Sequence, residues 1–146
     1  MATFQFRLER VLEWYRTQLQ VEENRLAGCL AALNRVQERI ARLEAECLSV
    51  EREVIASASL TARDLAALGL YRLQSRKQAA LMEEERARRE SAQREQTNAV
   101  QRAQRRVRLV EKLRERRLSE HLYTEDRALE TLAAEAYLSK WITAKR

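Results

Sequence analysis

The sequence contains no proline and only two glycines in 146 residues. Proline and glycine are the residues that most often end or interrupt a helix, so this chain has few places where a helix must stop. Aromatic residues are also scarce, at 5%, whereas charged residues make up 34% of the chain. The abundant residues are alanine, leucine, arginine, glutamate and glutamine, which are strong helix formers. The composition therefore favours long helices or a coiled coil over a compact globule.

Membrane and secretion signals are absent from the sequence. No stretch approaches the roughly 20 apolar residues that span a bilayer, and the N-terminal residues lack the apolar run of a signal peptide. Cys29 and Cys47 are 18 positions apart on one predicted helix. At about 1.5 Å per residue they lie roughly 27 Å from each other, too far for a disulfide. We expect a cytoplasmic protein whose cysteines pack in the helix core.

Residues that carry catalysis or bind metals are equally sparse. His121 is the sole histidine, and neither cysteine has a partner at a metal-ligand spacing. No glycine-rich loop is present to hold the phosphates of a nucleotide. We therefore expect no enzymatic activity, no cofactor and no metal site.

A heptad repeat of apolar residues runs through the first third of the chain. Thirteen of its fourteen a and d positions are apolar, and only Glu22 interrupts the series. The predicted core residues are Leu8, Leu12, Tyr15, Leu19, Leu26, Cys29, Leu33, Val36, Ile40, Leu43, Cys47, Val50 and Val54. Seven heptads in register predict a coiled-coil helix over about residues 4–56.

The heptad pattern stops at residues 57–61, where small and hydroxyl side chains replace the apolar ones. Thr61 followed by Asp64 is typical of a helix N-cap with a carboxylate in the first turn. We expect a turn and a short helical segment over about 57–71, with Gly69 marking a break or a close contact. A second helix is predicted over about 72–141, with a weaker apolar pattern than the first.

A short turn between two long helices brings the second back along the first. We therefore predict an all-α fold, with residues 1–146 forming a single domain, a long two-helix antiparallel coiled coil. In this arrangement six of the eight aromatics meet at one end, namely Phe4, Phe6, Trp14, Tyr15, Tyr137 and Trp141. The alternative is a parallel homodimer, in which the first helix pairs with its own copy.

Positive charge is concentrated near the C-terminal end, where residues 101–146 hold 12 basic and 7 acidic side chains. The basic run consists of Arg102, Arg105, Arg106, Arg108, Lys112, Arg114, Arg116 and Arg117. It is compatible with a solvated helix face, with a DNA-binding basic region, or with docking to an acidic protein ring. The DNA interpretation fits less well, because a basic zipper places its zipper directly after the basic region. Here the strong heptads lie upstream of the run.

A second candidate surface is a short apolar patch beside the predicted turn, formed by Leu68, Tyr71 and Leu73 together with Leu70. One interpretation is local packing that closes the turn. The other is an exposed aromatic and aliphatic knob that binds a partner protein.

Two segments resemble the FliJ family. The opening Phe4-x-Phe6-x-Leu8-x-x-Val11-Leu12 is similar to the start of those proteins. The block Val110-Glu111-Lys112-Leu113-Arg114-Glu115-Arg116-Arg117 resembles the family's LEKLxER block, at a similar place toward the C-terminus. Further on, the sequence has Leu129-Glu130 and Ala134-Glu135 where the family commonly has a Glu-Gln and an Asp-Glu pair.

The resemblance implies a stalk protein of the flagellar type III export apparatus, similar to the gamma-subunit coiled coil of rotary ATP synthases. Its implied partners are the hexameric export ATPase, the export gate membrane protein and export chaperones. It would bind no nucleic acid and reach the inner membrane only through its partners, and we expect a monomer in isolation. The alternatives are the equivalent stalk of a virulence type III secretion system and a basic nucleic-acid-binding or scaffold coiled coil.

Overall fold

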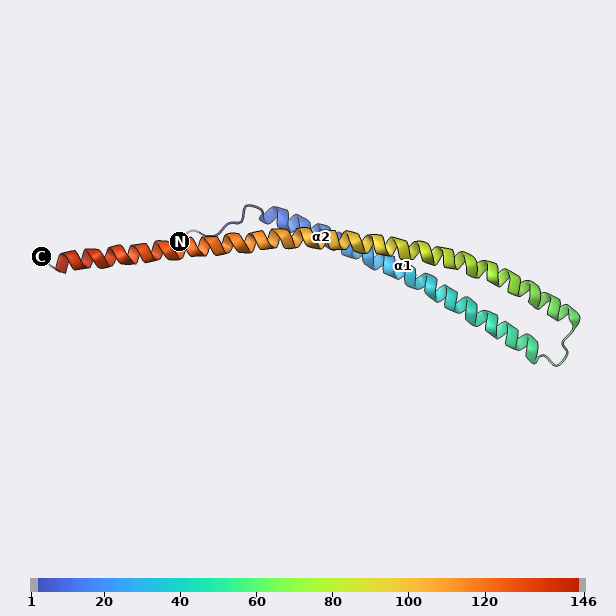
Figure 1. Ribbon diagram of the computed structural model, residues 1–146. Helices are drawn as coiled ribbons and strands as arrows, with labels where there is room; N and C mark the ends of the chain where they lie inside the picture. The colour runs from blue at the N-terminus through green and yellow to red at the C-terminus, as the bar shows by residue number, and fades with distance from the viewer. Residues whose placement is uncertain (1–2, 145–146) are drawn as a thin grey trace. The chain divides into compact units, whose positions relative to one another are not determined.

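The computed structural model describes residues 3–144, which fold into two α-helices joined by a short turn. Helix α1 spans Glu9–Ala56 and has 48 residues, and helix α2 spans Ala62–Ala144 and has 83 residues (Figure 1). The described residues include no β-strand. The prediction of an all-α, two-helix hairpin is therefore confirmed. Within residues 3–144, neither helix is apolar enough over a sufficient length to cross a membrane.

Both helices contribute to two compact units. Unit 1 combines residues 1–19 with residues 102–146, and unit 2 consists of residues 20–101. Within residues 3–144, four ion pairs join the helices: Glu9–Arg114 and Arg16–Glu111 in unit 1, and Arg39–Glu85 and Glu51–Arg72 in unit 2. In each unit the residue number on α2 falls as the number on α1 rises. The paired segments are thus antiparallel within one chain, as the hairpin prediction requires.

Burial along α1 follows the heptad pattern. Every a and d position from 12 to 54 is buried or half-buried, including Glu22. Leu12 is completely buried and Val36 is 3% exposed. Leu8 departs from the predicted core, because it precedes the helix and is 38% exposed.

The most completely buried cluster lies in unit 1. Leu12 packs there with Val107 and Val110 of α2, and partly buried neighbours surround these three side chains. The neighbours are Phe6, Tyr15 and Leu19. Valine suits this position because its branched side chain has few rotamers to lose when it is packed.

In unit 2 the one polar residue of the α1 heptads is matched by a polar partner on α2. The Gln96 amide donates hydrogen bonds to the Glu22 carboxylate and, at 3.0 Å, to the Glu22 carbonyl. Arg25 donates to the other carboxylate oxygen at 2.9 Å. Such partners are needed because a half-buried carboxylate without hydrogen bonds costs free energy.

Helix α1 begins at Glu9, whereas the sequence predicted a start near residue 4. Phe4 and Phe6 are both half-buried, and the residues next to them are exposed. In a helix, residues two apart point about 200° away from each other, so both rings could not face α2. The non-helical segment allows both: Phe6 reaches the unit 1 core, and the Phe4 ring lies 5.5 Å from that of His121.

The turn at residues 57–61 and the cap of the second helix are where the sequence placed them. The Thr61 hydroxyl accepts a hydrogen bond from the Asp64 amide at 3.2 Å, and the Thr61 amide donates to the Asp64 carboxylate at 3.0 Å. These reciprocal bonds satisfy amides that have no partner inside the helix. The predicted N-cap is therefore confirmed.

The separate short helix predicted over 57–71 is wrong, because α2 runs without interruption from Ala62. Gly69 lies inside it, and a Cβ at this position would meet nothing within 4 Å, so no close approach requires a glycine. The cost of one glycine, about 1 kcal/mol, is small in a helix of strong formers. Leu68 and Tyr71, on either side, are buried and half-buried, and this packing offsets the cost.

The predicted meeting of aromatic side chains at one end is also wrong. Tyr137 and Trp141 lie near the end of α2 and are 71% and 52% exposed. The reason is the difference in length between the two helices. In unit 1, α1 begins at Glu9, which pairs with Arg114, and the remaining residues of α2 run past that point (Figure 1).

Candidate functional site

The basic run lies on α2 in unit 1, and its members are all exposed. Three of them are engaged in ion pairs: Arg114 with Glu9 of α1, and Arg116 and Arg117 with Glu120. The other five form no ion pair within the described part of the chain, namely Arg102, Arg105, Arg106, Arg108 and Lys112. The charge available to a partner is therefore concentrated over residues 102–112.

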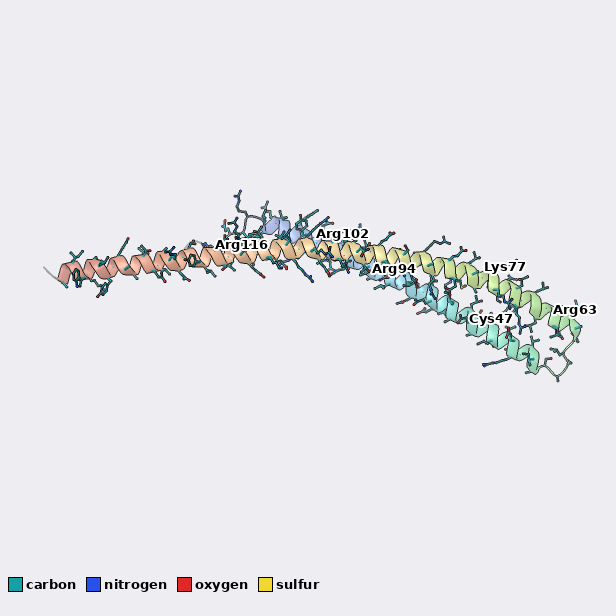
Figure 2. The ribbon with its side chains drawn as sticks, viewed as in Figure 1. Cys47, Arg63, Lys77, Arg94, Arg102 and Arg116 are labelled. Atoms are coloured by element: carbon teal, nitrogen blue, oxygen red, sulfur yellow. The ribbon has the colours of Figure 1, made fainter. Side chains whose placement is uncertain are left out.

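The spacing of the helix separates these charges from the core. Val107 and Val110 face α1, whereas positions 102, 105, 109, 112 and 116 recur every three or four residues on the opposite side. Figure 2 labels Arg102 and Arg116 at the two ends of this stretch. Leu109 lies between the cations and is 72% exposed. We call this surface the cationic face.

The cationic face suits binding rather than catalysis. A guanidinium offers five N–H donors in a fixed plane, which match the two oxygens of a carboxylate or a phosphate. An exposed leucine among these groups adds an apolar contact that a purely ionic surface lacks. Sequence reasoning identified the cations but not Leu109, whose exposure depends on which side of α2 faces α1.

The patch beside the turn is divided between the core and the surface. Leu68 is 7% exposed and Tyr71 is half-buried, so Leu68 packs inside the hairpin, contrary to a role as a partner contact. Leu73 is 52% exposed and Leu70 is 70% exposed. The outward-facing part of the patch is therefore Leu70 with Leu73.

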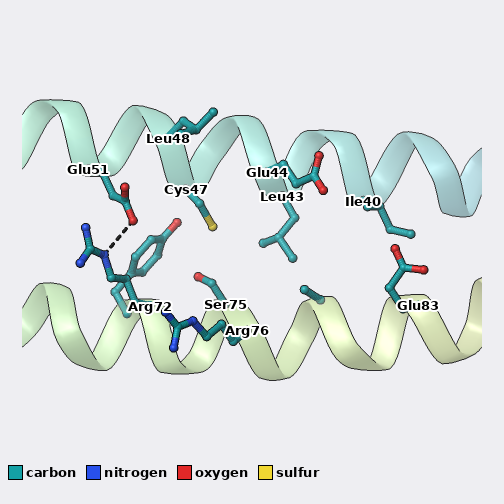
Figure 3. Close-up of a pocket in the computed structure, with 12 residues that line it drawn as sticks. Ile40, Leu43, Glu44, Cys47, Leu48, Glu51, Arg72, Ser75, Arg76 and Glu83 are labelled. Carbon is teal, nitrogen blue, oxygen red and sulfur yellow. Dashed lines mark hydrogen bonds and ion pairs between the residues drawn. The ribbon is translucent and has the colours of Figure 1, made fainter.

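A groove between the helices of unit 2 is lined by Ile40, Leu43, Cys47, Tyr71, Ser75 and Ala79, among others (Figure 3). The Glu51–Arg72 ion pair, at 2.7 Å, lies at its edge. Burial between the helices raises the pKa of the Tyr71 phenol, and the neighbouring Cys47 thiol raises it further. Two small side chains of α2, Ser75 and Ala79, line this groove together with larger ones from both helices.

No cluster of three or more histidine, cysteine, aspartate or glutamate side chains in residues 3–144 could hold a metal ion. The His121 ring packs against that of Phe4 at a tilt of 42°, and its Nε2 lies 3.4 Å from a Glu125 carboxylate oxygen. Its surroundings are those of a packing residue at the N-terminal segment.

A further surface was missed altogether by the sequence reasoning. The described residues of α2 beyond Glu125 are all exposed, and they include Leu129, Leu132 and Leu138. The signal that could have revealed this surface is helix length, since a shorter first helix cannot cover the whole of a longer second one.

Comparisons with known proteins found no match: no family model, no curated protein and no solved structure matches the chain.

Proposed function

We propose that this chain is a non-enzymatic stalk of a flagellar protein export apparatus, inserting into the hexameric export ATPase and linking it to the export gate. The observation that carries the proposal is the stretch 102–112, where five exposed cations form no ion pair within residues 3–144 and Leu109 is exposed beside them. The resemblance of the N-terminal segment and of residues 110–117 to the FliJ family supports it. The antiparallel hairpin also agrees with a two-helix stalk.

The proposed mechanism is mechanical and electrostatic. The cationic face meets acidic side chains of the ATPase ring through geometrically fixed pairs, and Leu109 adds a contact that salt does not weaken. The exposed part of the turn patch, Leu70 and Leu73, contacts the export gate. The stalk acts in the cytoplasm, reaches the inner membrane only through these partners, and also binds export chaperones. The equivalent stalk of a virulence secretion system would use the same surfaces.

A nucleic-acid-binding coiled coil is the second candidate, and the density of charge in residues 102–117 favours it. This stretch holds eight basic side chains and two acidic ones. Binding to phosphates releases counterions, so the affinity of such a protein falls steeply with salt. Salt dependence therefore separates the two candidates.

The test measures stimulation of the cognate export ATPase by the wild type and by a variant with Arg102, Arg105, Arg106 and Arg108 changed to glutamate. We expect stimulation to survive moderate salt in the wild type and to fall about tenfold or more in the variant. Its helix content should persist, because glutamate is a comparable helix former.

A matched control reverses four cations elsewhere: Arg35, Arg42, Arg52 and Arg63, which are exposed and form no ion pair in the described structure. This control should stimulate the ATPase as the wild type does. Full stimulation by the first variant would reduce the cationic face to a solvated surface. Tight binding of DNA at physiological salt, without any effect on the ATPase, would favour the nucleic-acid candidate instead.

A further inference from the structure

The C-terminal part of α2 continues beyond the reach of α1. In unit 1, α1 begins at Glu9, beside Arg114, and the described residues before it, 3–8, line a groove with α2 residues up to Thr124. Every described residue from Asp126 to Ala144 is exposed. Figure 1 shows this part of α2, in red, running past the start of α1.

This segment carries an apolar stripe along one side of the helix. The stripe begins before this segment, with the half-buried Leu118 and with Leu122, and continues through Leu129, Leu132, Ala133 and Ala136; we call it the tail stripe. Its members are spaced as the residues of one helix face are. Leu122, Leu129 and Leu132 are 51%, 50% and 61% exposed. Apolar side chains at such spacing are typical of a surface that packs against another helix.

The tail stripe continues the side of α2 that packs on α1. Val107 lies in the unit 1 core, and Leu118 and Leu129 follow it at intervals of 11 residues, which is about three helical turns. The stripe is thus an extension of an existing helix–helix contact onto a segment that α1 does not cover. A helix that covered it would take over the position of α1.

The charge of the segment differs from that of the cationic face. Residues 118–144 contain five acidic and two basic side chains, whereas residues 102–117 contain two and eight. Asp126 and Lys140 lie along the same edge of the tail stripe, 14 residues apart, which is close to four turns. An antiparallel copy of the same segment places opposite charges side by side along this edge.

We propose that the tail stripe is the contact surface for a second copy of this chain, aligned antiparallel. In this arrangement Leu129 of each copy packs beside Ala136 of the other, and the two Ala133 side chains face each other. Asp126 then pairs twice with Lys140 across the two-fold axis. The second copy runs along α2 in the direction that α1 has, so it occupies the place where α1 is missing.

The charges select this register over its neighbours. A shift of the pairing by one heptad toward the N-terminus brings the two Asp126 carboxylates together. A shift by one heptad in the other direction brings the two Lys140 ammonium groups together. Like charges at facing positions repel and direct a coiled coil to another register. The register with Asp126 beside Lys140 has neither conflict.

The contact is small, because it involves one pair of helical segments about seven turns long. Association should therefore depend on concentration, with monomers at high dilution. The proposed dimer departs from the monomer that the sequence predicted, in which the second helix is the only partner of the first. The inference does not rest on the proposed export function, since it uses only the exposure, spacing and charge of this segment.

Sedimentation equilibrium of the full chain over a wide concentration range tests the proposal. We expect a monomer–dimer equilibrium, and a loss of affinity of about tenfold or more when Leu129 and Leu132 are both changed to aspartate. The matched control changes Leu138 and Ile142 to aspartate; these are 56% and 61% exposed and lie off the stripe. A monomer at every concentration, or equal losses in both variants, would overturn the proposal.

A charge swap tests the second copy and the register together. Asp126→Lys and Lys140→Asp should each weaken self-association, because each places like charges at both Asp126–Lys140 contacts. A mixture of the two variants should restore it, since every contact then joins opposite charges. Failure of the mixture to associate would contradict the antiparallel register. Circular dichroism of each variant verifies that the helix content is unchanged.

Discussion

The α1 segments of the two units share the heptad pattern of apolar residues. Their α2 segments differ in the polarity of the residues that face α1. In unit 1, Leu12 packs with Val107 and Val110, and these two residues and Ala103 are at most 8% exposed. In unit 2 the α1 heptads are apolar except at Glu22, but the covered residues of α2 between Glu85 and Thr97 are all polar. The half-buried residues of α2 there include Glu85, Glu90, Gln93, Gln96 and Thr97.

This difference shows that an apolar heptad does not by itself produce a buried core. Most a and d positions of α1 in unit 2 are only half-buried, although their heptad is uninterrupted after Glu22. The hydrophobic contribution of a side chain depends on the area it loses to water, and this area is set by the partner. A fully buried leucine such as Leu12 in unit 1 should therefore contribute more to stability than a half-buried one in unit 2.

Replacing one leucine in each unit gives the largest expected effect. Leu12→Ala should lower the free energy of unfolding by about 3 kcal/mol, because a fully buried leucine leaves a cavity. Leu33→Ala, at a half-buried position, should cost about 1 kcal/mol. Urea denaturation followed at 222 nm measures both. The exposed Leu30 changed to alanine serves as a control, and equal losses at Leu12 and Leu33 would contradict the comparison.

Substitutions in the Glu22–Gln96 pair of unit 2 should change the free energy of unfolding by less. The size of the change should depend on whether one or both residues are replaced. Gln96→Leu removes the hydrogen bonds to Glu22 and should cost about 1 kcal/mol, because the carboxylate loses a donor. Adding Glu22→Leu should recover this loss, since two leucines complete the apolar heptad at this level. A double-mutant cycle by urea denaturation gives the coupling. Additive losses would show that the pair does not act as a unit.

The smallest expected effect concerns the cap of α2. Hydrogen bonds from the Thr61 side chain and backbone lower the pKa of Asp64 below its ordinary value. A lowered pKa in the folded state means that the carboxylate stabilises the fold above its unfolded pKa, about 4. This contribution is lost as pH falls through the folded pKa. The stability difference between wild type and Asp64→Asn should thus be present at pH 7 and shrink below pH 4.

Thermal melts of the two proteins at pH 7 and pH 3 measure this difference. Thr61→Ala removes the hydroxyl that accepts from the Asp64 amide and is the reference for loss of the whole cap. A difference that grows on acidification would show that the Asp64 carboxylate destabilises the cap.

Local sequence rules were sufficient where neighbours along the chain decide the structure. The Thr61–Asp64 cap depends on residues three apart, and the end of α1 at Ala56 follows from the loss of the heptad at residues 57–61. The α1 face was readable for the same reason, because its period of three and four residues is written in one segment. The start of α1 was not readable, since Phe4 and Phe6 leave the helix for contacts with α2.

The candidate surfaces needed both kinds of information. The cations at 102–117 are visible in the sequence, but which of them remain available depends on Glu9 and Glu120. Leu68 and Leu70 are indistinguishable by type, yet one is 7% and the other 70% exposed. Their positions differ by two residues, which places them on opposite sides of α2 once α1 fixes the inner side.

The sequence by itself determined that the chain is helical and that the first helix carries one continuous apolar face. It did so because helix propensity and heptad spacing are properties of neighbouring residues. Only the tertiary structure decided how much of each helix is covered. Coverage depends on where α1 begins relative to α2, and that point is set by packing between residues about 100 positions apart, such as Glu9 and Arg114. The exposed tail stripe exists for this reason, because no local rule relates the length of one helix to that of its partner.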